Sequence, residues 1–339
     1  MIGTTEIMSQ NQNTKNIVVT GASGYIGGIT SIKLKEQGYN VYGIDLVEKS
    51  HLNKFFDEFV RGDFTDYSSY LLIKKVKPDA IIHCAGTSLV GPSMQHPGLY
   101  FHNNVSRTNL LLNFIKDEAP NAKFIFSSSA AVYGSWGSDP YREFSETRPV
   151  SPYGESKLMV ESQLAWYRKA YDLKYVALRY FNACGADHQG RHGQDPEATH
   201  IFAKLFESVE KDIAFNLYGS DYRTKDNTCI RDYVHVEDIA DAHIKCIDTD
   251  VRGIYNLGSL KGTSNLECLE YVEKYLKTEI VVNVCPKREG DPAVLIADPT
   301  KFKVATGWSA WRTLPMIISH LKAWYSSETY KSLINNKRS

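Results

Sequence analysis

Residues 16–27 read NIVVTGASGYIG, a short apolar run followed by a glycine-spaced turn. The run Asn16–Thr20 is typical of a buried parallel strand. An amphipathic segment, Tyr25–Gln37, follows the turn and stops at Gly38, as a helix commonly does. A strand that passes through such a turn into a helix is the opening unit of a doubly wound α/β sheet.

The same alternation of strand and helix continues through the first half of the chain. Short apolar runs predict strands, and longer amphipathic stretches predict helices. The predicted strands are Val41–Asp45, Phe59–Asp63, Ala80–His83, Lys123–Ser127 and Tyr175–Phe181, and the predicted helices are Tyr67–Val76, Tyr100–Glu118 and Tyr153–Tyr171. This alternation predicts an α/β fold of the Rossmann type, with a doubly wound parallel sheet.

Beyond Gly185 the pattern loosens, because residues 186–196 (ADHQGRHGQDP) are polar and rich in turn formers. Two later segments, Ile239–Ile247 and Gly253–Leu257, are regular enough to return to the first domain. The predicted boundaries are 15–185 with 233–260 for the Rossmann domain, 186–232 with 261–339 for a smaller C-terminal α/β substrate domain, and 1–14 for a disordered tail.

The overall composition narrows the class of protein. The chain has 339 residues and a formal net charge of zero, so it lacks the global basic field that nucleic-acid binding usually needs. No run is long and apolar enough to cross a membrane. The six cysteines are scattered, with no CxxC pair and no histidine at metal-ligand spacing. We therefore expect a cytoplasmic protein with reduced thiols and no metal, and neither nucleic acid nor membrane as a partner.

The glycine-spaced turn predicts a dinucleotide site. Gly21 would permit the turn, Gly24 would let the backbone approach a pyrophosphate, and Gly27 would allow close packing of helix on strand. Asp45 ends the second predicted strand about 20 residues on, where a carboxylate accepts from both ribose hydroxyls and repels a 2′-phosphate. This pattern favours NAD over NADP. Asp63, after the third strand, is either an adenine contact or a solvated turn residue.

Tyr153 and Lys157 lie four residues apart in the stretch SPYGESK, so they share one face of a helix. A free tyrosine has a pKa of about 10, and an adjacent fixed cation is one of the few ways to lower it. A phenolate beside a nicotinamide can remove the proton of an alcohol. We predict that Tyr153 is a base whose pKa is lowered by Lys157.

The spacing of GxxGxxG and YxxxK resembles the extended short-chain dehydrogenase/reductase family. Further stretches, in order and over roughly 15–325, look like the UDP-galactose (UDP-glucose) 4-epimerases of that family, and a series of this kind is more specific than one motif. They are HCAG at 83–86, NNV at 103–105, FSSSAAVYG at 126–134, LRYFNACGA at 178–186, CIRDYVHVEDIADAH at 229–243, YNLGS at 255–259 and REGD at 288–291.

The resemblance implies a catalytic trio and two sets of binding residues. Ser129 would join Tyr153 and Lys157 by hydrogen-bonding the sugar O4 and the tyrosine oxygen. The implied NAD site is lined by Tyr25, Ile26, Asp63, Phe64, Ala85, Gly86, Asn103, Tyr153, Lys157 and Tyr180. The implied uridine diphosphate contacts are Asn182, His200, Ile201, Tyr218, Arg231, Arg288 and Asp291.

The physical chemistry of these side chains agrees with those roles. Tyr218 can stack on uracil, while Arg231 and Arg288 can clamp phosphate oxygens through a planar fork. Each arginine could instead be half of a surface ion pair.

The chain departs from the family at two places. The family often has a lysine near the cofactor phosphates where this chain has Thr87 or Ser88, which would weaken cofactor retention. Many members have Asn-Asn where this chain has Thr199 and His200, although a Thr-His form also occurs in the family.

The resemblance implies an NAD-dependent isomerase of galactose and carbohydrate metabolism, which interconverts UDP-galactose and UDP-glucose through a transient 4-keto sugar. Ala130 and Ala131 replace the acidic pair of related dehydratases, which argues against dehydration. Leu295 would wall the sugar's 2-substituent, and its intermediate size leaves a UDP-N-acetylglucosamine 4-epimerase open. A UDP-glucuronate 4-epimerase, a net-oxidising dehydrogenase and a non-catalytic NAD-sensing protein are also compatible with these motifs. A homodimer is expected, because the family commonly dimerises through helices equivalent to 100–118 and 153–171.

Overall fold

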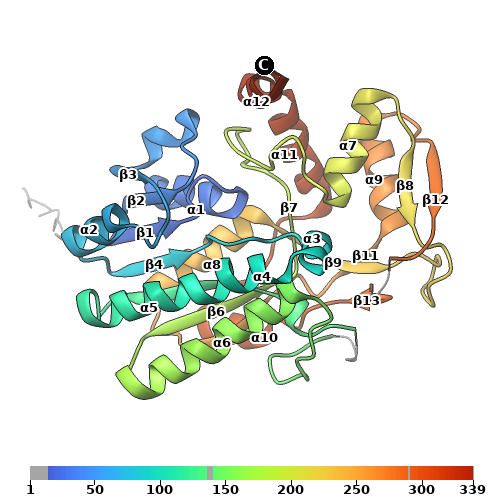
Figure 1. Cartoon of the computed structure of the whole chain (residues 1–339). Coiled ribbons are helices and arrows are strands. Elements are labelled where there is room, and N and C mark those ends of the chain that lie inside the picture. Colours follow the sequence, from blue (N-terminus) through green and yellow to red (C-terminus); the bar gives the residue numbers. More distant parts are fainter. Residues whose placement is uncertain (1–13, 136–139, 289–290, 339) are drawn as a thin grey trace, which may run out of the picture.

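The computed structural model describes residues 14–135, 140–288 and 291–338, so nearly all of the predicted tail at 1–14 lies outside the described residues. The centre of the described chain is a seven-stranded sheet in which every pair of neighbours is parallel (Figure 1). In spatial order the strands are β10 (Gly253–Leu257), β6 (Tyr175–Tyr180), β5 (Lys123–Ser129), β4 (Ala80–His83), β1 (Asn16–Thr20), β2 (Asn40–Asp45) and β3 (Glu58–Arg61). The predicted doubly wound parallel sheet is confirmed.

Helices bury an apolar stripe on each face of this sheet. Leu34 of α1 and Ile239 of α8 join the core on one face, while Leu72 of α2, Leu112 of α5 and Val160 of α6 join the core on the other. The helical elements are α1 (Tyr25–Glu36), η1 (Ser50–Phe55), α2 (Tyr67–Val76), α3 (Val90–Gln95), α4 (Pro97–Tyr100), η2 (Phe101–Ser106), α5 (Arg107–Glu118), η3 (Ala130–Val132), α6 (Pro152–Tyr171) and α8 (Val236–Asp248).

Three of the differences between predicted and observed elements affect the position of site residues. The helix predicted at Tyr100–Glu118 is interrupted, because η2 is a π-helical turn between α4 and α5. The fifth strand continues to Ser129, two residues beyond the prediction. The third strand ends at Arg61, since Asp63 starts a turn in which its backbone N–H donates to Asp66 Oδ2 at 2.7 Å. Two predicted site residues therefore lie at the carboxyl edge of the sheet: Ser129 ends β5, and Asp63 follows the end of β3.

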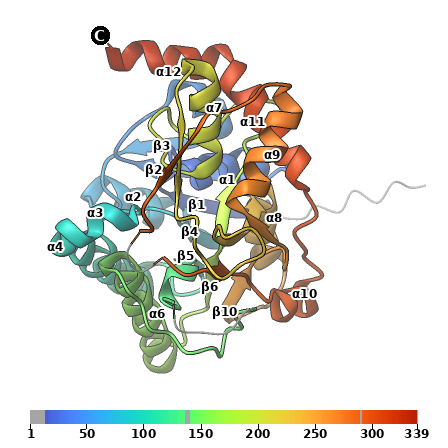
Figure 2. The same ribbon diagram turned by 90° about the vertical axis from the view of Figure 1, so that its right-hand side faces the viewer.

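The later part of the chain forms a second body of structure with its own core. That core contains apolar residues of α7, α9 and α11, which contact one another on one side of the molecule (Figure 2). The elements here are β7 (Asn182–Cys184), α7 (Ile201–Lys211), β8 (Phe215–Tyr218), β9 (Ile230–His235), β11 (Gly262–Ser264), α9 (Asn265–Leu276), β12 (Val282–Cys285), β13 (Val294–Leu295), α10 (Thr300–Thr306), α11 (Leu314–Ser326) and α12 (Glu328–Arg338).

Segments from late in the sequence also return to the central sheet. β10 pairs with β6, and α8 packs against α1. The boundaries of the two predicted domains stay a prediction. Across the described ranges 14–135, 140–288 and 291–338, no helix combines the length and the apolar character that a membrane span requires.

Candidate active site

A cavity of about 810 Å³ opens at the carboxyl edge of the central sheet. Its walls come from the segments that follow β1, β2, β3, β4, β5 and β6, together with the first turn of α6 and the polar segment at 194–200. In open α/β sheets, ligands bind in the crevice outside the carboxyl ends of the strands. The predicted site residues that line this cavity are Gly21, Gly24, Tyr25, Ile26, Gly27, Asp45, Asp63, Phe64, Ala85, Gly86, Asn103, Ser129, Tyr153, Lys157, Tyr180, Asn182 and His200.

The glycine turn has no room for larger residues. Gly21 has a φ of +69°, and a Cβ there would lie 2.6 Å from the backbone nitrogen of Ala85. A Cβ on Gly27 would lie 2.1 Å from the carbonyl oxygen of Gly21. Gly24 is the N-cap of α1, so the helix begins with its N–H groups at the cavity wall. This bare turn at a helix N-terminus fits a dinucleotide pyrophosphate.

The two aspartates of the predicted adenosine side are held differently. Asp45 is the last residue of β2, and its carboxylate accepts from the backbone nitrogens of Ser23 and Val47, each at 3.0 Å. Asp63 Oδ1 accepts from the hydroxyl of Thr65 at 2.6 Å and pairs with Arg107 at 2.8 Å. Asp63 is therefore a buried anchor of the cavity wall and not a solvated turn residue.

Asn104 is a buried residue that supports the cavity wall and that sequence reasoning missed. Its Oδ1 accepts from the backbone nitrogen of Thr87 at 2.8 Å, and its Nδ2 donates to the Thr87 carbonyl and to Ser156 Oγ. Asn103, the residue that was predicted, donates to Thr87 Oγ1 at 3.0 Å. Asn104 thus fixes the segment after β4 to α6. The second asparagine of the NNV motif could have indicated this role, since a buried amide needs several hydrogen-bond partners.

The sequence SPYG brings Tyr153 to Ser129. Ser151 caps α6 by accepting from the backbone nitrogen of Gly154 at 3.1 Å, and Pro152 occupies the first turn. A Cβ on Gly154 would lie 2.5 Å from the carbonyl oxygen of Ala131, so the start of α6 packs directly on η3. Ser129, the last residue of β5, accepts from the backbone nitrogen of Ala131 in η3. Its hydroxyl proton therefore remains available for the tyrosine oxygen.

Burial dominates the electrostatics of the Tyr153–Lys157 pair. The Lys157 Nζ lies 5.8 Å from the centroid of the Tyr153 ring and 4.9 Å from that of Phe126. Burial lowers the pKa of Lys157 to about 8, against an opposing effect of the Cys84 thiol. Burial also raises the pKa of Tyr153, while the hydrogen bond with Ser129 acts to lower it.

The predicted lowering of the Tyr153 pKa by its lysine neighbour is therefore wrong. The loss of hydration destabilises the phenolate of Tyr153 by more than the hydrogen bond with Ser129 stabilises it.

A buried ion pair supports the helix that carries both groups. Arg179 donates to both carboxylate oxygens of Glu161, at 2.9 and 2.6 Å, and Ser128 Oγ donates to the same carboxylate at 2.6 Å. Glu161 belongs to α6, whereas Ser128 and Arg179 belong to β5 and β6. The pair therefore holds α6 to the sheet directly behind Ser129.

On the predicted sugar-nucleotide side, the structure brings only some residues to the cavity. Asn182 and His200 line it, and the Nδ2 atom of Asn182 is buried without a hydrogen-bond partner. A buried amide donor that lacks a partner is a group that a polar ligand can satisfy. The predicted residues that are not among the lining residues are Ile201, Tyr218, Arg231, Arg288, Asp291 and Leu295.

Four of those residues gather around β9 with Tyr222, a residue that the sequence did not single out. Arg231 pairs with Asp291 at 2.5 Å, and the Arg288 guanidinium lies 4.1 Å from the centroid of the Tyr218 ring. Burial is the main cause that raises the pKa of Tyr222 to about 12, and the negative charge of Asp291 adds to it. The Tyr222 hydroxyl is buried without a hydrogen-bond partner. We call Tyr218, Tyr222, Arg231, Arg288 and Asp291 the arginine cluster.

Leu295 connects the arginine cluster with the cavity. It lies opposite Arg231 in the β13–β9 pair, and it packs on the small core that contains Phe181. Phe181 in turn lines the cavity. Ile201 begins α7 and packs on the core of the later structural elements.

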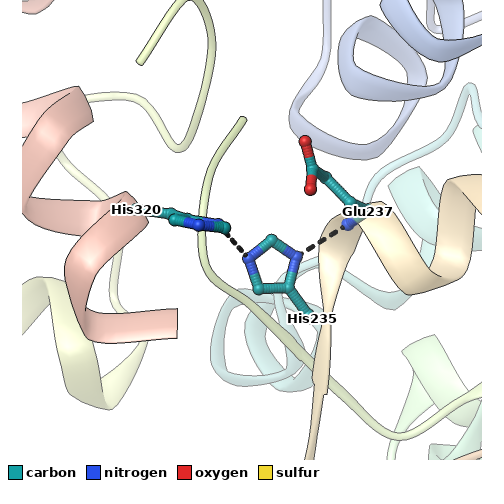
Figure 3. A group of neighbouring side chains, drawn as sticks. All are labelled: His235, Glu237 and His320. Atoms are coloured by element: carbon teal, nitrogen blue, oxygen red, sulfur yellow. Dashed lines mark hydrogen bonds between the residues drawn. The ribbon is translucent and has the colours of Figure 1, made fainter. Parts of the chain in front are cut away.

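The fold also assembles a cluster of potential metal ligands that the sequence analysis did not predict. His235, Glu237 and His320 lie together, as Figure 3 shows, with His235 Nε2 2.9 Å from His320 Nδ1. His235 Nδ1 accepts from the backbone nitrogen of Glu237 at 3.0 Å, so in the neutral ring the proton lies on Nε2. The Glu237 carboxylate is paired with Arg312 at 2.9 Å and with His188 at 2.7 Å. All of these atoms already have hydrogen-bond or ion-pair partners, and the His235–His320 contact links the end of β9 to α11.

Comparisons with known proteins agree with this geometry. A sequence profile of the NAD dependent epimerase/dehydratase family matches residues 17–258. The UDP-glucose 4-epimerase of Halalkalibacterium halodurans is 38% identical over 330 residues, which cover 95% of this chain and 98% of the relative.

Two solved UDP-glucose 4-epimerases superpose over most of the chain, each with a TM-score of 0.86. The Brucella ovis enzyme, in complex with NAD, is 35% identical and covers 92% of this chain and 98% of its own. The Bifidobacterium longum enzyme, in complex with NAD+ and UDP, is 32% identical and covers 93% and 99%. This chain belongs to the NAD dependent epimerase/dehydratase family.

Proposed function

We propose that this protein is an NAD-dependent 4-epimerase that interconverts UDP-galactose and UDP-glucose. The observation that carries the proposal is the meeting of Ser129, Tyr153 and Lys157 with the glycine turn in one cavity. An alcohol-oxidising trio beside a dinucleotide cradle is what a reversible oxidation at a sugar hydroxyl requires. The names of the curated and solved relatives support the same reaction.

NAD is the cofactor, and when bound it would supply a reversible hydride acceptor for C4 of the sugar. The turn that contains Gly21, Gly24 and Gly27 would hold its pyrophosphate, with Gly24 at the closest approach, and Asp45 would hold its adenosine ribose. The further residues proposed for the cofactor are Tyr25, Ile26, Asp63, Phe64, Ala85, Gly86, Asn103, Lys157 and Tyr180.

The chain's own groups manage the proton of the sugar 4-hydroxyl. Tyr153 is the proposed base that removes this proton and later returns it, and Ser129 is the proposed hydrogen-bonding partner of the tyrosine oxygen and of the sugar O4. Lys157 supplies a positive charge to the phenolate as long as its ammonium is protonated, which its pKa of about 8 allows at neutral pH.

The substrate is proposed to be held by its nucleotide. The arginine cluster contributes two cations, Arg231 and Arg288, and they suit the two phosphates of uridine diphosphate. Asn182, His200, Ile201 and Leu295 are the remaining proposed contacts. A sugar that is bound mainly through its nucleotide is free to present either face to the cofactor.

The direct test is to incubate purified protein with UDP-galactose and no added cofactor, and to resolve the products by NMR. UDP-glucose should form until the two sugars reach equilibrium, and Tyr153→Phe should form it at least about 100-fold more slowly. Parallel incubations with UDP-N-acetylgalactosamine and UDP-glucuronate separate this reaction from the two related epimerisations. Stoichiometric accumulation of reduced dinucleotide without inversion would contradict the proposal.

We also propose that the protein is a homodimer through the outer faces of α5 and α6. These two helices contact each other and lie side by side in Figure 1. They expose large apolar side chains: Leu110 is 52% exposed, Met159 41% and Trp166 66%. A patch of this kind marks an interaction surface. Light scattering should give twice the mass of the 38.3 kDa chain, and Trp166→Glu should give the monomer.

We propose a cytoplasmic location because the cysteines are not paired in disulfides. All six are free, and Cys184, Cys229, Cys246 and Cys268 are buried thiols. Proteins of reducing compartments keep their cysteines in this state. Thiol titration of the unfolded protein from a cell extract should find six free thiols.

A further inference from the structure

His192 reaches the glycine turn from the polar segment between β7 and α7. Its side chain is fully buried, and its Nε2 lies 3.1 Å from the carbonyl oxygen of Gly24, the N-cap of α1. On the other side of the ring, His192 Nδ1 lies 3.1 Å from His51 Nε2. His192 is not among the residues that line the cavity, and the proposed epimerisation gives it no role.

The partners of the His192 ring fix the position of its proton. Burial lowers the pKa of His192 to about 3, so the ring is neutral and has one donor nitrogen. A carbonyl oxygen can only accept, so His192 Nε2 carries the proton and donates to Gly24. Nδ1 is then an acceptor for the Nε2–H of His51. The Gly24 carbonyl therefore has a donor from outside α1, besides the backbone nitrogen of Gly28 at 2.8 Å.

The first turn of α1 makes room for this ring at Gly28. A Cβ there would lie 2.5 Å from His192 Nε2. Gly28 follows the three glycines of the GxxGxxG spacing and is not one of them. Glycine within a helix is less favourable than alanine, so the close approach of His192 gives a physical reason for glycine at this position.

The Gly24 carbonyl sets the direction of a donor at the cavity wall. In a planar trans peptide the C=O and the N–H point in opposite directions, so this carbonyl orients the N–H of Tyr25. The first N–H groups of a helix have no partner within it, and Tyr25 lines the cavity. A capping side chain would steady such a turn by accepting from one of these N–H groups, but Gly24 makes no such cap. His192 holds the turn by its carbonyl instead, which leaves the N–H groups for an anion.

We propose that His192 is a positioning residue for the cofactor, which holds the Gly24 carbonyl from outside α1 and thereby aims the Tyr25 N–H at the dinucleotide pyrophosphate. A donor that is oriented in advance loses less free energy on binding than one that must first be ordered, and such gains mainly slow dissociation. The inference rests on the proposed function, because it takes the cavity to be the dinucleotide site.

The test measures how fast the cofactor leaves the holoenzyme. Holoenzyme that carries isotope-labelled NAD is mixed with an excess of unlabelled NAD, and the label that remains on the protein is followed by filtration and mass spectrometry. His192→Leu should release NAD about tenfold faster, as expected when one hydrogen bond to a charged group is weakened. His192→Gln keeps an N–H donor, and it should stay within about threefold of the original rate.

A competition assay adds a measurement that a general loss of stability would not change. ADP carries a pyrophosphate, whereas adenosine has no phosphate. In competition against labelled NAD, His192→Leu should bind ADP about tenfold more weakly and adenosine within about threefold of the original affinity. An equal loss for both ligands would mean that His192 supports the fold and not the pyrophosphate site.

Two variants of α1 separate positioning from helix stability. In Gly28→Ala the added Cβ should push the His192 ring off the Gly24 carbonyl and speed NAD release about as much as His192→Leu does, although alanine favours the helix. Leu34→Ala is the control, because Leu34 is buried toward the other end of α1 and its loss weakens packing only. Its release rate should match that of the original protein.

The outcomes distinguish this inference from the proposed function. An original rate of release in folded His192→Leu would overturn the inference and leave NAD binding and epimerisation intact. If His192→Leu does not fold, an unchanged rate in Gly28→Ala would overturn it equally, and so would fast release from Leu34→Ala. A protein that binds no NAD would instead contradict the proposed function itself.

Discussion

The sheet-edge cavity and the arginine cluster hold their functional groups in opposite ways. In the cavity the backbone fixes the geometry, since Gly154 packs on Ala131 and Gly21 on Ala85. In the arginine cluster, side chains hold one another, because Arg231 pairs with Asp291 and Arg288 lies on a tyrosine ring. A preorganised region needs no rearrangement during reaction, whereas paired charges must exchange partners when a ligand binds. Changes in the cavity should therefore affect turnover, and changes in the cluster should affect affinity.

The largest expected effect is that of Tyr153→Phe. The change removes the proposed base, so kcat should fall roughly 100- to 10,000-fold. The dissociation constant of UDP should change little, because the phenol does not belong to the arginine cluster. Steady-state kinetics and calorimetry with UDP measure the two quantities. Unchanged turnover would refute the role of Tyr153.

Gly154→Ala tests whether backbone contact sets the cavity geometry. The added Cβ would meet the Ala131 carbonyl oxygen at 2.5 Å and push the start of α6 away from η3. A displacement of about 1 Å can reduce turnover by about 100-fold. Gly98→Ala is the matched control, because a Cβ there meets nothing within 4 Å. Equal kcat values for the two variants would remove the proposed distinction between the regions.

Arg288→Ala tests the opposite half of the comparison. Loss of one charged hydrogen-bonding partner for the diphosphate should raise KM by about 10- to 100-fold, with kcat nearly unchanged. Arg142→Ala is the control, since Arg142 pairs with Asp298 at 3.0 Å and its side chain is 55% exposed. A fall in kcat with unchanged KM would mean that the cluster takes part in the chemistry.

The charge of Lys157 should set the alkaline limit of activity. Its pKa is lowered to about 8, so the ammonium is present below that pH and is lost as the pH rises through it. Above this point kcat/KM should fall by about tenfold per pH unit. Lys157→Arg should move the limit upward, because a guanidinium stays protonated. An unshifted limit in that variant would assign the titration to another group.

The smallest effect concerns the stability of the sheet beneath the cavity. Burial lowers the pKa of His83 to about 3, below the unfolded value of about 6.5. The stability that depends on a neutral His83 is therefore complete above about pH 6.5 and is lost as the pH falls toward 3. His83→Gln should reduce this acid slope of the free energy of unfolding by up to about 1.4 kcal/mol per pH unit. Urea unfolding between pH 7 and pH 4 measures it, and the exposed His102→Gln should leave the slope unchanged.

Local patterns predicted the sheet well, because buried parallel strands are continuous apolar runs. Asn16–Thr20 and Ala80–His83 are strands within the predicted bounds. The interruption at Phe101–Ser106 was missed, since a π-helical turn keeps the apolar pattern of a helix. Asn104 and Tyr222 were missed because their roles depend on partners far away in the sequence. The pKa of Tyr153 was predicted with the wrong sign, because sequence spacing reveals a neighbouring charge but not the burial that outweighs it.

The fate of the hydrogen at C4 of the sugar tests most directly whether one cavity holds base and cofactor together throughout inversion. UDP-galactose that carries deuterium at C4 is converted by the holoenzyme in the presence of excess unlabelled NAD. We predict that the UDP-glucose formed keeps its deuterium at C4, because the reduced cofactor stays in the cavity until it returns the label. Loss of the label to water, or its appearance in the added dinucleotide, would contradict this prediction.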